Sequence, residues 1–187
     1  MTRRPLSRVR NPTIASARLI LQLPRSRDAR DLEAMFHDPR VYRYLPYARR
    51  IEPGHEVVSR AHQGVRSGTA YRFIVRTKEC GAFVGSALLF GVDHHNKSAE
   101  LGYALARDQW GCGYATEAGS ALLRWGFKSL RLRRVSAIVA VENLASQLVL
   151  RKLGFRREGR RREAGRRGNR WGDDLEFGLL RPEFRES

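Results

Sequence analysis

The chain has very little cysteine and no long hydrophobic run. Only two of its 187 residues are cysteines, Cys80 and Cys112, so a disulfide framework is excluded and a reducing, cytoplasmic setting is expected. No run of 18 apolar residues occurs, and we therefore expect no membrane-spanning helix. The length fits one compact domain that can bury a sizeable core.

Acidic residues and lysines are also scarce. The chain has 19 acidic against 36 basic residues, which gives a formal net charge of +17, and only four of the basic residues are lysines while 32 are arginines. Such a surface attracts phosphates, nucleic acid or acidic proteins through a salt-sensitive field. A bias in coding composition explains the arginine excess equally well, so the charge alone selects no partner.

The first 16 residues contain four arginines, two prolines and no acidic residue. The prolines break any amphipathic helix, which disfavours an organelle transit peptide. We expect a disordered basic tail over residues 1–16, followed by a single folded domain over residues 17–187.

A stretch from Ser98 to Phe127 has the pattern of a strand, a tight glycine loop and a helix. Gly111, Gly113 and Ala115 alternate along the loop, so successive backbone N–H groups can approach one acceptor. The helix has no side-chain N-cap unless Thr116 serves, which leaves its first amides free for an anion. The expected phosphate-binding residues are Trp110, Gly111, Cys112, Gly113, Tyr114, Ala115 and Thr116.

Hydrophobic patterning predicts the remaining elements. Strands are expected at residues 18–23, 71–76, 82–90, 98 to about 105, 135–141 and 171–180, and helices at 28–36, 41–45, 52–65, about 114–127 and from about 143. A helix links the strands that contain Glu100 and Val135, so these two strands should be parallel within an otherwise antiparallel sheet. Residues 151–170 carry ten basic residues and suggest a basic hairpin loop. His94 and His95 lack neighbouring ligand partners, which favours a solvated turn over a metal site.

Several short motifs occur together from about Arg18 to the end of the chain. They are Ala99–Tyr103, Trp110–Ala115 with Glu117 and Ala118, Asn143–Ser146, Lys152–Phe155, Glu158–Gly159, and Asp173 ahead of Phe177. In this order and spacing the chain resembles the GNAT superfamily of N-acetyltransferases, in the branch of the ribosomal-protein N-terminal acetyltransferases (RimJ/RimL type).

This resemblance implies an α/β (α+β) fold: a mixed, mostly antiparallel central sheet of about seven strands with flanking helices. It also implies acetyl-CoA as co-substrate, no metal, and direct attack of an amine on the thioester in a ternary complex. Homodimers are frequent in the resembled branch, whereas the sequence itself does not determine the oligomeric state.

Glu100 is the candidate general base. It lies between the apolar residues Ala99 and Leu101, where a carboxylate can have a raised pKa and accept the proton of the amine through water. The alternative is a strand-face glutamate paired with one of the many arginines; the resemblance favours the base. It further implies that a backbone N–H near Leu105 or Ala106, freed by a bulge, stabilises the oxyanion.

Ser146 is the candidate partner of the coenzyme sulfur. Many superfamily members have a tyrosine seven residues after the asparagine, where this chain has Leu150, while the RimJ/RimL-like branch has a serine at the position of Ser146. Ser146 is expected to protonate or hydrogen-bond the leaving thiolate, or else to cap the helix. Asn143 is implied to bind the pantetheine amides, with an N-cap as the alternative. Arg151 either meets the nucleotide end of coenzyme A or faces solvent.

Two classes of function remain open. The favoured one is an acetyl-CoA-dependent N-acetyltransferase whose acceptor is a protein N-terminus, such as that of a ribosomal protein, or a small amine. Tyr42, Tyr44 and Tyr47 are candidates for acceptor contact or for core packing. The alternative is a nucleic-acid-binding or ribosome-binding protein that keeps the GNAT fold without catalysis, although no aromatic residue lies between Arg156 and Arg170 for base stacking.

Overall fold

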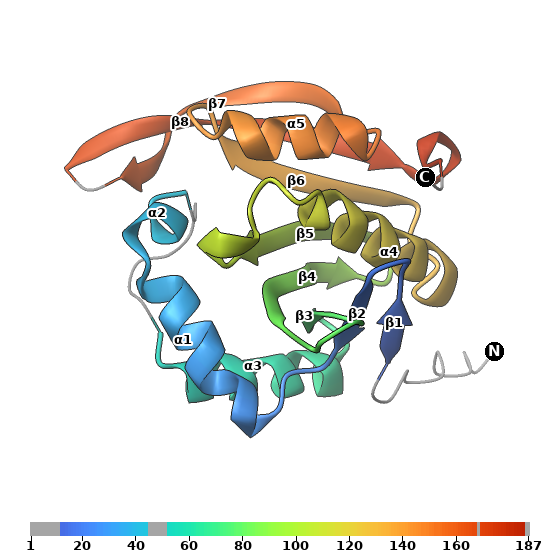
Figure 1. The fold of residues 1–187 in the computed structure, drawn as a ribbon. Coiled ribbons are helices and arrows are strands. Elements are labelled where there is room, and N and C mark those ends of the chain that lie inside the picture. Colours follow the sequence, from blue (N-terminus) through green and yellow to red (C-terminus); the bar gives the residue numbers. More distant parts are fainter. Residues whose placement is uncertain (1–11, 45–51, 168, 186–187) are drawn as a thin grey trace.

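One eight-stranded sheet organises the chain (Figure 1). The computed structural model describes residues 12–44, 52–167 and 169–185. In spatial order the strands are β1 (Thr13–Ala15), β2 (Leu19–Gln22), β3 (Tyr71–Thr77), β4 (Phe83–Asp93), β5 (Ser98–Leu105), β6 (Arg134–Ala140), β8 (Arg170–Leu180) and β7 (Arg156–Arg167). Every neighbouring pair is antiparallel except β5 and β6, which are parallel. The expected mixed, mostly antiparallel sheet is confirmed.

Helices cover both faces of the sheet. They are α1 (Ala29–His37), α2 (Pro39–Tyr42), α3 (Gly54–Ser67), α4 (Tyr114–Ser129) and α5 (Leu144–Lys152), with short 3-10 turns at Ser26–Asp28, Arg107–Gln109 and Arg181–Glu183. Helices α4 and α5 bury Leu122 and Leu150 against one face, in the larger core. Helices α1 and α3, which lie together in Figure 1, bury Leu32 and Val57 against Ile74 on the other. The crossover through α4 makes β5 and β6 parallel.

Strand β1 corrects the expected extent of the N-terminal tail. Ile14 is buried and opposite Leu21 of β2, so residues 13–15 are an ordered strand and not part of a disordered tail. A single buried residue between two small, exposed neighbours gives too short an alternation to be recognised in the sequence. The rest of the expected tail, residues 1–11, lies outside the described residues.

Strand β7 corrects the expected basic hairpin loop. Its residues pair with β8 from Arg156↔Gly178 to Arg167↔Arg170, and the two strands form the long hairpin at the top of Figure 1. Because β7 is an edge strand with polar residues on both faces, the usual apolar alternation is missing. Charged side chains on such an edge discourage pairing with another sheet.

Glu117, in the first turn of α4, ties the β1–β2 turn to the helix. Its Oε1 accepts hydrogen bonds from the Arg18 backbone N–H (2.6 Å) and the Ser16 hydroxyl (2.8 Å), and its Oε2 accepts one from Arg18 Nε (2.7 Å). Burial alone would raise the pKa of Glu117, but these hydrogen bonds hold it below its ordinary value. The carboxylate therefore stabilises the fold only while it is ionised.

Replacing Glu117 with glutamine is expected to lower the free energy of unfolding by about 1–2 kcal/mol at pH 7, because charge-assisted hydrogen bonds become neutral ones. A depressed folded-state pKa contributes stability that is present above the unfolded value, about 4.3, and is lost as pH falls through the folded value. Urea denaturation should thus show the two proteins converging in acid. Glu79→Gln, at an exposed turn, is the matched control. A deficit that persists unchanged in acid would contradict this account.

Candidate active site

Strands β5 and β6 are paired only at one end. Their ladder runs from Ser98↔Arg134 to Glu100↔Ser136, although β5 continues to Leu105 and β6 to Ala140. Beyond Glu100 the two strands splay apart. Consecutive residues of a strand direct their N–H groups to opposite sides. The Ala106 N–H donates to Val84 O (3.0 Å) on the β4 side. The amides of Leu105 and Tyr103, one and three residues before Ala106, therefore point toward the splay.

The end of β5 has no bulge, which corrects one expectation. The register with β4 is regular from Gly85↔Leu105 to Phe90↔Glu100, and its irregularity lies beyond Phe90, at the opposite end of β5. The Ala106 amide is occupied by Val84 O, so Ala106 is not a free oxyanion donor in this structure. The Leu105 amide faces the splay through ordinary strand alternation, and a bulge is not needed to expose it.

Glu100 lies on β5 with its side chain on the face opposite Ala99 and Leu101, which are buried against α4 and α5. Burial raises the pKa of Glu100 to about 7; Arg161 opposes this shift and Glu176 adds to it. Among the described residues, Glu100 has no salt-bridge partner, so the alternative of a paired strand-face glutamate finds no support there. A carboxyl with this pKa can exchange a proton near neutral pH.

Ser146 makes a contact that the sequence analysis missed. Its hydroxyl lies 2.8 Å from the Tyr103 hydroxyl, and the Tyr103 O–H also reaches Ser146 O at 3.3 Å. The pair links β5 to α5. Burial raises the pKa of Tyr103 to about 12 while the Ser146 hydrogen bond opposes the rise, so the phenol keeps its proton at neutral pH. One signal was available: Tyr103 lies on the apolar face of β5, where a hydroxyl needs a partner.

Asn143, and not Ser146, caps helix α5. The Asn143 side chain accepts a hydrogen bond from the Ser146 backbone N–H (3.1 Å), which leaves the Ser146 hydroxyl for Tyr103. The helix-cap alternative for Ser146 is therefore wrong, and the N-cap alternative for Asn143 is what the structure shows. Arg151 lies exposed in the last turn of the same helix.

The glycine loop opens directly into α4. Gly113 is the N-cap residue with a left-handed φ of 78°, and no side chain caps the helix. Thr116 lies within the helix, so it does not serve as the cap. Gly111 also has a left-handed φ, of 79°, and a Cβ placed there would meet nothing within 4 Å. Backbone amides with this geometry fit a diphosphate group.

The flanks of this loop are polar and accessible. Trp110 Nε1 donates to Leu105 O (3.0 Å) and so fixes the loop to the end of β5. Cys112 is exposed, with its Sγ 3.6 Å from Trp110 O. The Arg18 guanidinium lies 4.6 Å from the ring centroid of Tyr114 and 3.5 Å from a Cβ placed on Gly113. A positive charge therefore stands beside the uncapped helix end.

A cavity of about 670 Å³ lies at the C-terminal end of β5, on the face that α1 covers. Its lining residues are Asp31, Ala34, Met35, Asp38, Phe83, Ala106, Arg107 and Asp108. This volume is in the range of small-molecule sites. Of the tyrosines considered for acceptor contact, Tyr42 and Tyr44 are partly buried at and just after α2, and Tyr47 lies outside the described residues.

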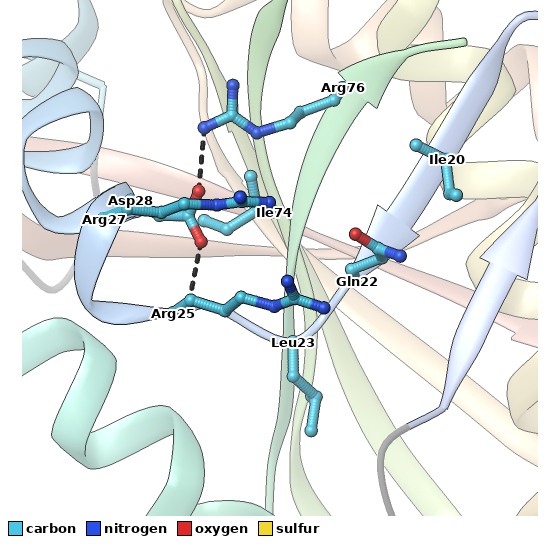
Figure 2. Close-up of a pocket in the computed structure, with 8 residues that line it drawn as sticks. All are labelled: Ile20, Gln22, Leu23, Arg25, Arg27, Asp28, Ile74 and Arg76. Atoms are coloured by element: carbon cyan, nitrogen blue, oxygen red, sulfur yellow. Dashed lines mark hydrogen bonds and ion pairs between the residues drawn. The ribbon is translucent and has the colours of Figure 1, made fainter. Parts of the chain in front are cut away.

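A second pocket, near β2 and β3, has a volume of only about 10 Å³ (Figure 2). Figure 2 shows Asp28 between two arginines: it accepts from the Arg25 backbone N–H (2.7 Å) and from Arg76 Nη2 (2.7 Å). The space suffices for about one water molecule. This pocket is therefore structural.

In the described ranges of the chain, no group of three or more His, Cys, Asp or Glu side chains is placed to hold a metal ion, and none of the helices is long and apolar enough to cross a membrane.

Comparisons with known proteins agree with this architecture. A family model for the acetyltransferase (GNAT) domain matches residues 18–156. The chain is 33% identical to the uncharacterized N-acetyltransferase p20 of Bacillus licheniformis over 175 residues, which cover 92% of this chain and 98% of the relative.

Solved structures show the same fold. Mycobacterium smegmatis RimJ in complex with CoA-disulfide has a TM-score of 0.85 at 26% identity and covers 95% of this chain and 91% of its own. A spermidine N-acetyltransferase from Vibrio cholerae, in complex with CoA and spermine, has a TM-score of 0.81 at 22% identity and covers 89% and 97%.

A mixed sheet that splays between two parallel strands, followed by a glycine loop and an uncapped helix, defines an acyl-CoA-dependent acyltransferase. The chain belongs to the GNAT acetyltransferase family. It is an N-acetyltransferase with acetyl-CoA as co-substrate and an amine as acceptor, and the resemblance to the RimJ/RimL type is confirmed.

Proposed function

We propose that the chain transfers the acetyl group of acetyl-CoA to a primary amine by direct attack within a ternary complex, with Glu100 as general base. The observation that carries this proposal is the placement on β5 of a carboxyl with a pKa near 7 and of two amides that face the splay. Residues 111–116 bind the diphosphate, and Asn143 lies beside the pantetheine arm. Exposed Arg151 is available to the nucleotide end.

Each step of the reaction then has a protein group. Glu100 takes a proton from the acceptor ammonium, through water, so that the neutral amine can attack. The Leu105 amide donates a hydrogen bond to the oxyanion of the tetrahedral intermediate. The Ser146 hydroxyl donates to the departing sulfur, and the Tyr103 hydroxyl, 2.8 Å away, donates to Ser146 in turn. The thioester supplies the activated acyl group.

The acceptor amine enters from the face that carries Glu100. Both a protein N-terminus and a small amine satisfy the chemistry. Proteins of similar structure include a ribosomal L7/L12 alpha-N-protein acetyltransferase and a spermidine N-acetyltransferase, so the fold occurs with both kinds of amine acceptor. A net charge of +17 repels polycationic acceptors at long range, which favours a protein target, such as a ribosomal protein, over a polyamine. The exposed free cysteines Cys80 and Cys112 support a cytoplasmic location.

Binding of RNA through β7 receives less support from the structure than from the sequence. Arg156, Arg160 and Arg161 form ion pairs with Glu183, Asp173 and Glu176. Part of the positive charge on this edge is therefore neutralised within the protein. These ion pairs favour the catalytic function over a non-catalytic RNA-binding one.

The proposal is tested by incubating the purified chain with acetyl-CoA and a panel of peptides with free N-termini and of small amines. Release of free thiol together with a 42 Da mass increase of one acceptor is the expected result. Thiol release that needs no acceptor, or coenzyme binding without transfer to any amine, would contradict it.

Ser146→Ala is expected to lower kcat about 10-fold and to leave the Kd for coenzyme A nearly unchanged. The effect is modest because a thiolate with a pKa near 8.5 needs little help to leave. Tyr103→Phe keeps the Ser146 hydroxyl and should lower kcat less. Steady-state kinetics combined with calorimetric coenzyme titration separate the two effects. An unchanged kcat in Ser146→Ala would remove the hydroxyl from the mechanism.

A further inference from the structure

Arg72 is a charged residue on the acceptor face that the mechanism does not use. It lies on β3 opposite Leu88 of β4, which in turn lies opposite Gly102 of β5. Directly opposed residues of a sheet share a face, and Glu100 is two residues from Gly102, so Arg72 and Glu100 project from the same face. Their Cα atoms are separated by about 10 Å across the sheet, which is two strand spacings, and by about 7 Å along the strands, which is one two-residue repeat. Both side chains are long enough to approach one ligand.

The Arg72 guanidinium has no carboxylate partner among the described residues. Its hydrogen bond goes from Nη1 to the neutral hydroxyl of Ser86 (3.1 Å). Glu52 acts on it electrostatically, but the Glu52 carboxylate is held at 2.6 Å by Arg60. Burial lowers the pKa of Arg72 to about 10, which Glu52 opposes and Arg60 reinforces. The residue remains partly accessible to solvent.

Arg76, on the same face, has its charge compensated within the protein. It follows Arg72 by two two-residue repeats on the same strand, and its Nη2 contacts Asp28 (2.7 Å) and Asp31 (2.8 Å). Burying a guanidinium is costly unless charged groups compensate it. Arg76 therefore has its two carboxylates within the protein, whereas Arg72, on the face that carries Glu100, has only the neutral Ser86 hydroxyl as hydrogen-bond partner among the described residues. Guanidinium forks match the geometry of carboxylates.

We propose that Arg72 binds a carboxylate of the acceptor, so that the substrates are amines that also carry a carboxylate. This inference rests on the proposed function and narrows its acceptor. The amine lies toward Glu100 and the carboxylate toward Arg72, above the apolar side chains of Leu88 and Phe90, which fill the space over Gly102. A second cationic group at the same place would meet the guanidinium, so polyamines are disfavoured. The carboxylate belongs to a free amino acid or to an acidic side chain of a peptide.

The test compares matched acceptors. One arm uses amino acids with increasing separation between the amino and carboxylate groups, and each is compared with its amide and with the diamine of the same length. The other arm uses dipeptide amides whose second residue is aspartate or asparagine. For at least one separation of the amino and carboxylate groups, kcat/KM should be at least 10-fold higher for the carboxylate acceptor than for its amide. The diamine of the same length should give the lowest kcat/KM. Equal values in both arms would overturn the proposal.

Arg72→Gln should raise KM for the preferred carboxylate acceptor at least 10-fold and leave KM for the matched amide unchanged. Arg66→Gln, which removes the same charge from an exposed position on α3, is the control and should behave as wild type. The rate with the amide reports whether Arg72→Gln folds, and Arg72→Lys should recover part of the affinity. Equal losses for carboxylate and amide would show a structural role and overturn the proposal.

A failure of the proposed acetyltransferase function can be distinguished from a failure of the inference on Arg72. If wild type acetylates no amine, calorimetric binding of the same acceptors in the presence of coenzyme A still tests Arg72. Tighter binding of the carboxylates to wild type than to Arg72→Gln supports the inference even then. Binding that is indifferent to both the carboxylate and the arginine overturns it.

Discussion

Replacing Gly113 with glutamate is expected to lower the affinity for coenzyme A by about 100-fold or more. The φ of 78° at Gly113 is a left-handed conformation that costs an L-residue about 1–2 kcal/mol. The new carboxylate would also stand at the uncapped start of α4 and next to Arg18, where it competes with the diphosphate for both. Each tenfold loss corresponds to about 1.4 kcal/mol. A loop that relaxes out of the strained conformation must regain it on binding, so both effects lower the affinity.

Calorimetric titration with coenzyme A measures this effect, and Gly81→Glu provides the control. Gly81 has a similar φ of 71°, and a Cβ placed there meets nothing within 4 Å. It lies in the exposed turn between β3 and β4, so the control introduces the same charge and the same backbone strain far from the loop. Wild-type affinity in Gly113→Glu would remove residues 111–116 from the coenzyme site.

Replacing Glu100 with glutamine is expected to lower kcat/KM about 100-fold at pH 8, because general base catalysis typically contributes a factor of this size or more. The active form of Glu100 is the carboxylate. With a pKa of about 7, the wild-type rate should therefore rise between about pH 6 and pH 8 and level off above it. The glutamine side chain does not titrate, so the variant should lack this rise.

A shifted profile would identify Glu100 as the titrating group more directly than a loss of rate. Glu176 raises the pKa of Glu100, so Glu176→Gln should move the rise in rate to lower pH without abolishing it. The ionisation of Glu100 also changes the free energy of unfolding, in a direction set by its pKa. Its folded-state pKa exceeds the unfolded value of about 4.3, so ionisation destabilises the fold as pH rises through this window, and Glu100→Gln should escape that loss. A wild-type rate profile in Glu100→Gln would rule out the base.

Much of the fold followed from the sequence because its elements have strong local patterns. Strand β3 was expected at residues 71–76 and spans Tyr71–Thr77, and the crossover between the strands of Glu100 and Val135 predicted the one parallel pair. The Gly111 and Gly113 alternation correctly placed a tight loop before α4. Each of these features depends on residues close together in the chain.

Features that depend on distant partners could not be obtained in this way. Tyr103 and Ser146 are 43 positions apart, and only the folded sheet brings their hydroxyls together. The roles of Arg72 and Arg76 differ because Asp28 and Asp31 lie next to one of them and not the other, which no spacing along β3 reveals. The splay of β5 and β6 is likewise a property of pairing, since both strands continue beyond their last shared pair.

The short ladder between β5 and β6 divides the eight strands into two leaves, β1–β5 and β6–β8, joined along a seam of three residue pairs. A molecule that lies in the open part of the seam touches both leaves at once. Because such a molecule binds the folded chain and not the unfolded one, its binding raises the free energy of unfolding. At the proposed site, acetyl-CoA would therefore bridge the two leaves as well as supply the acyl group, and thermal unfolding with and without coenzyme A measures this stabilisation.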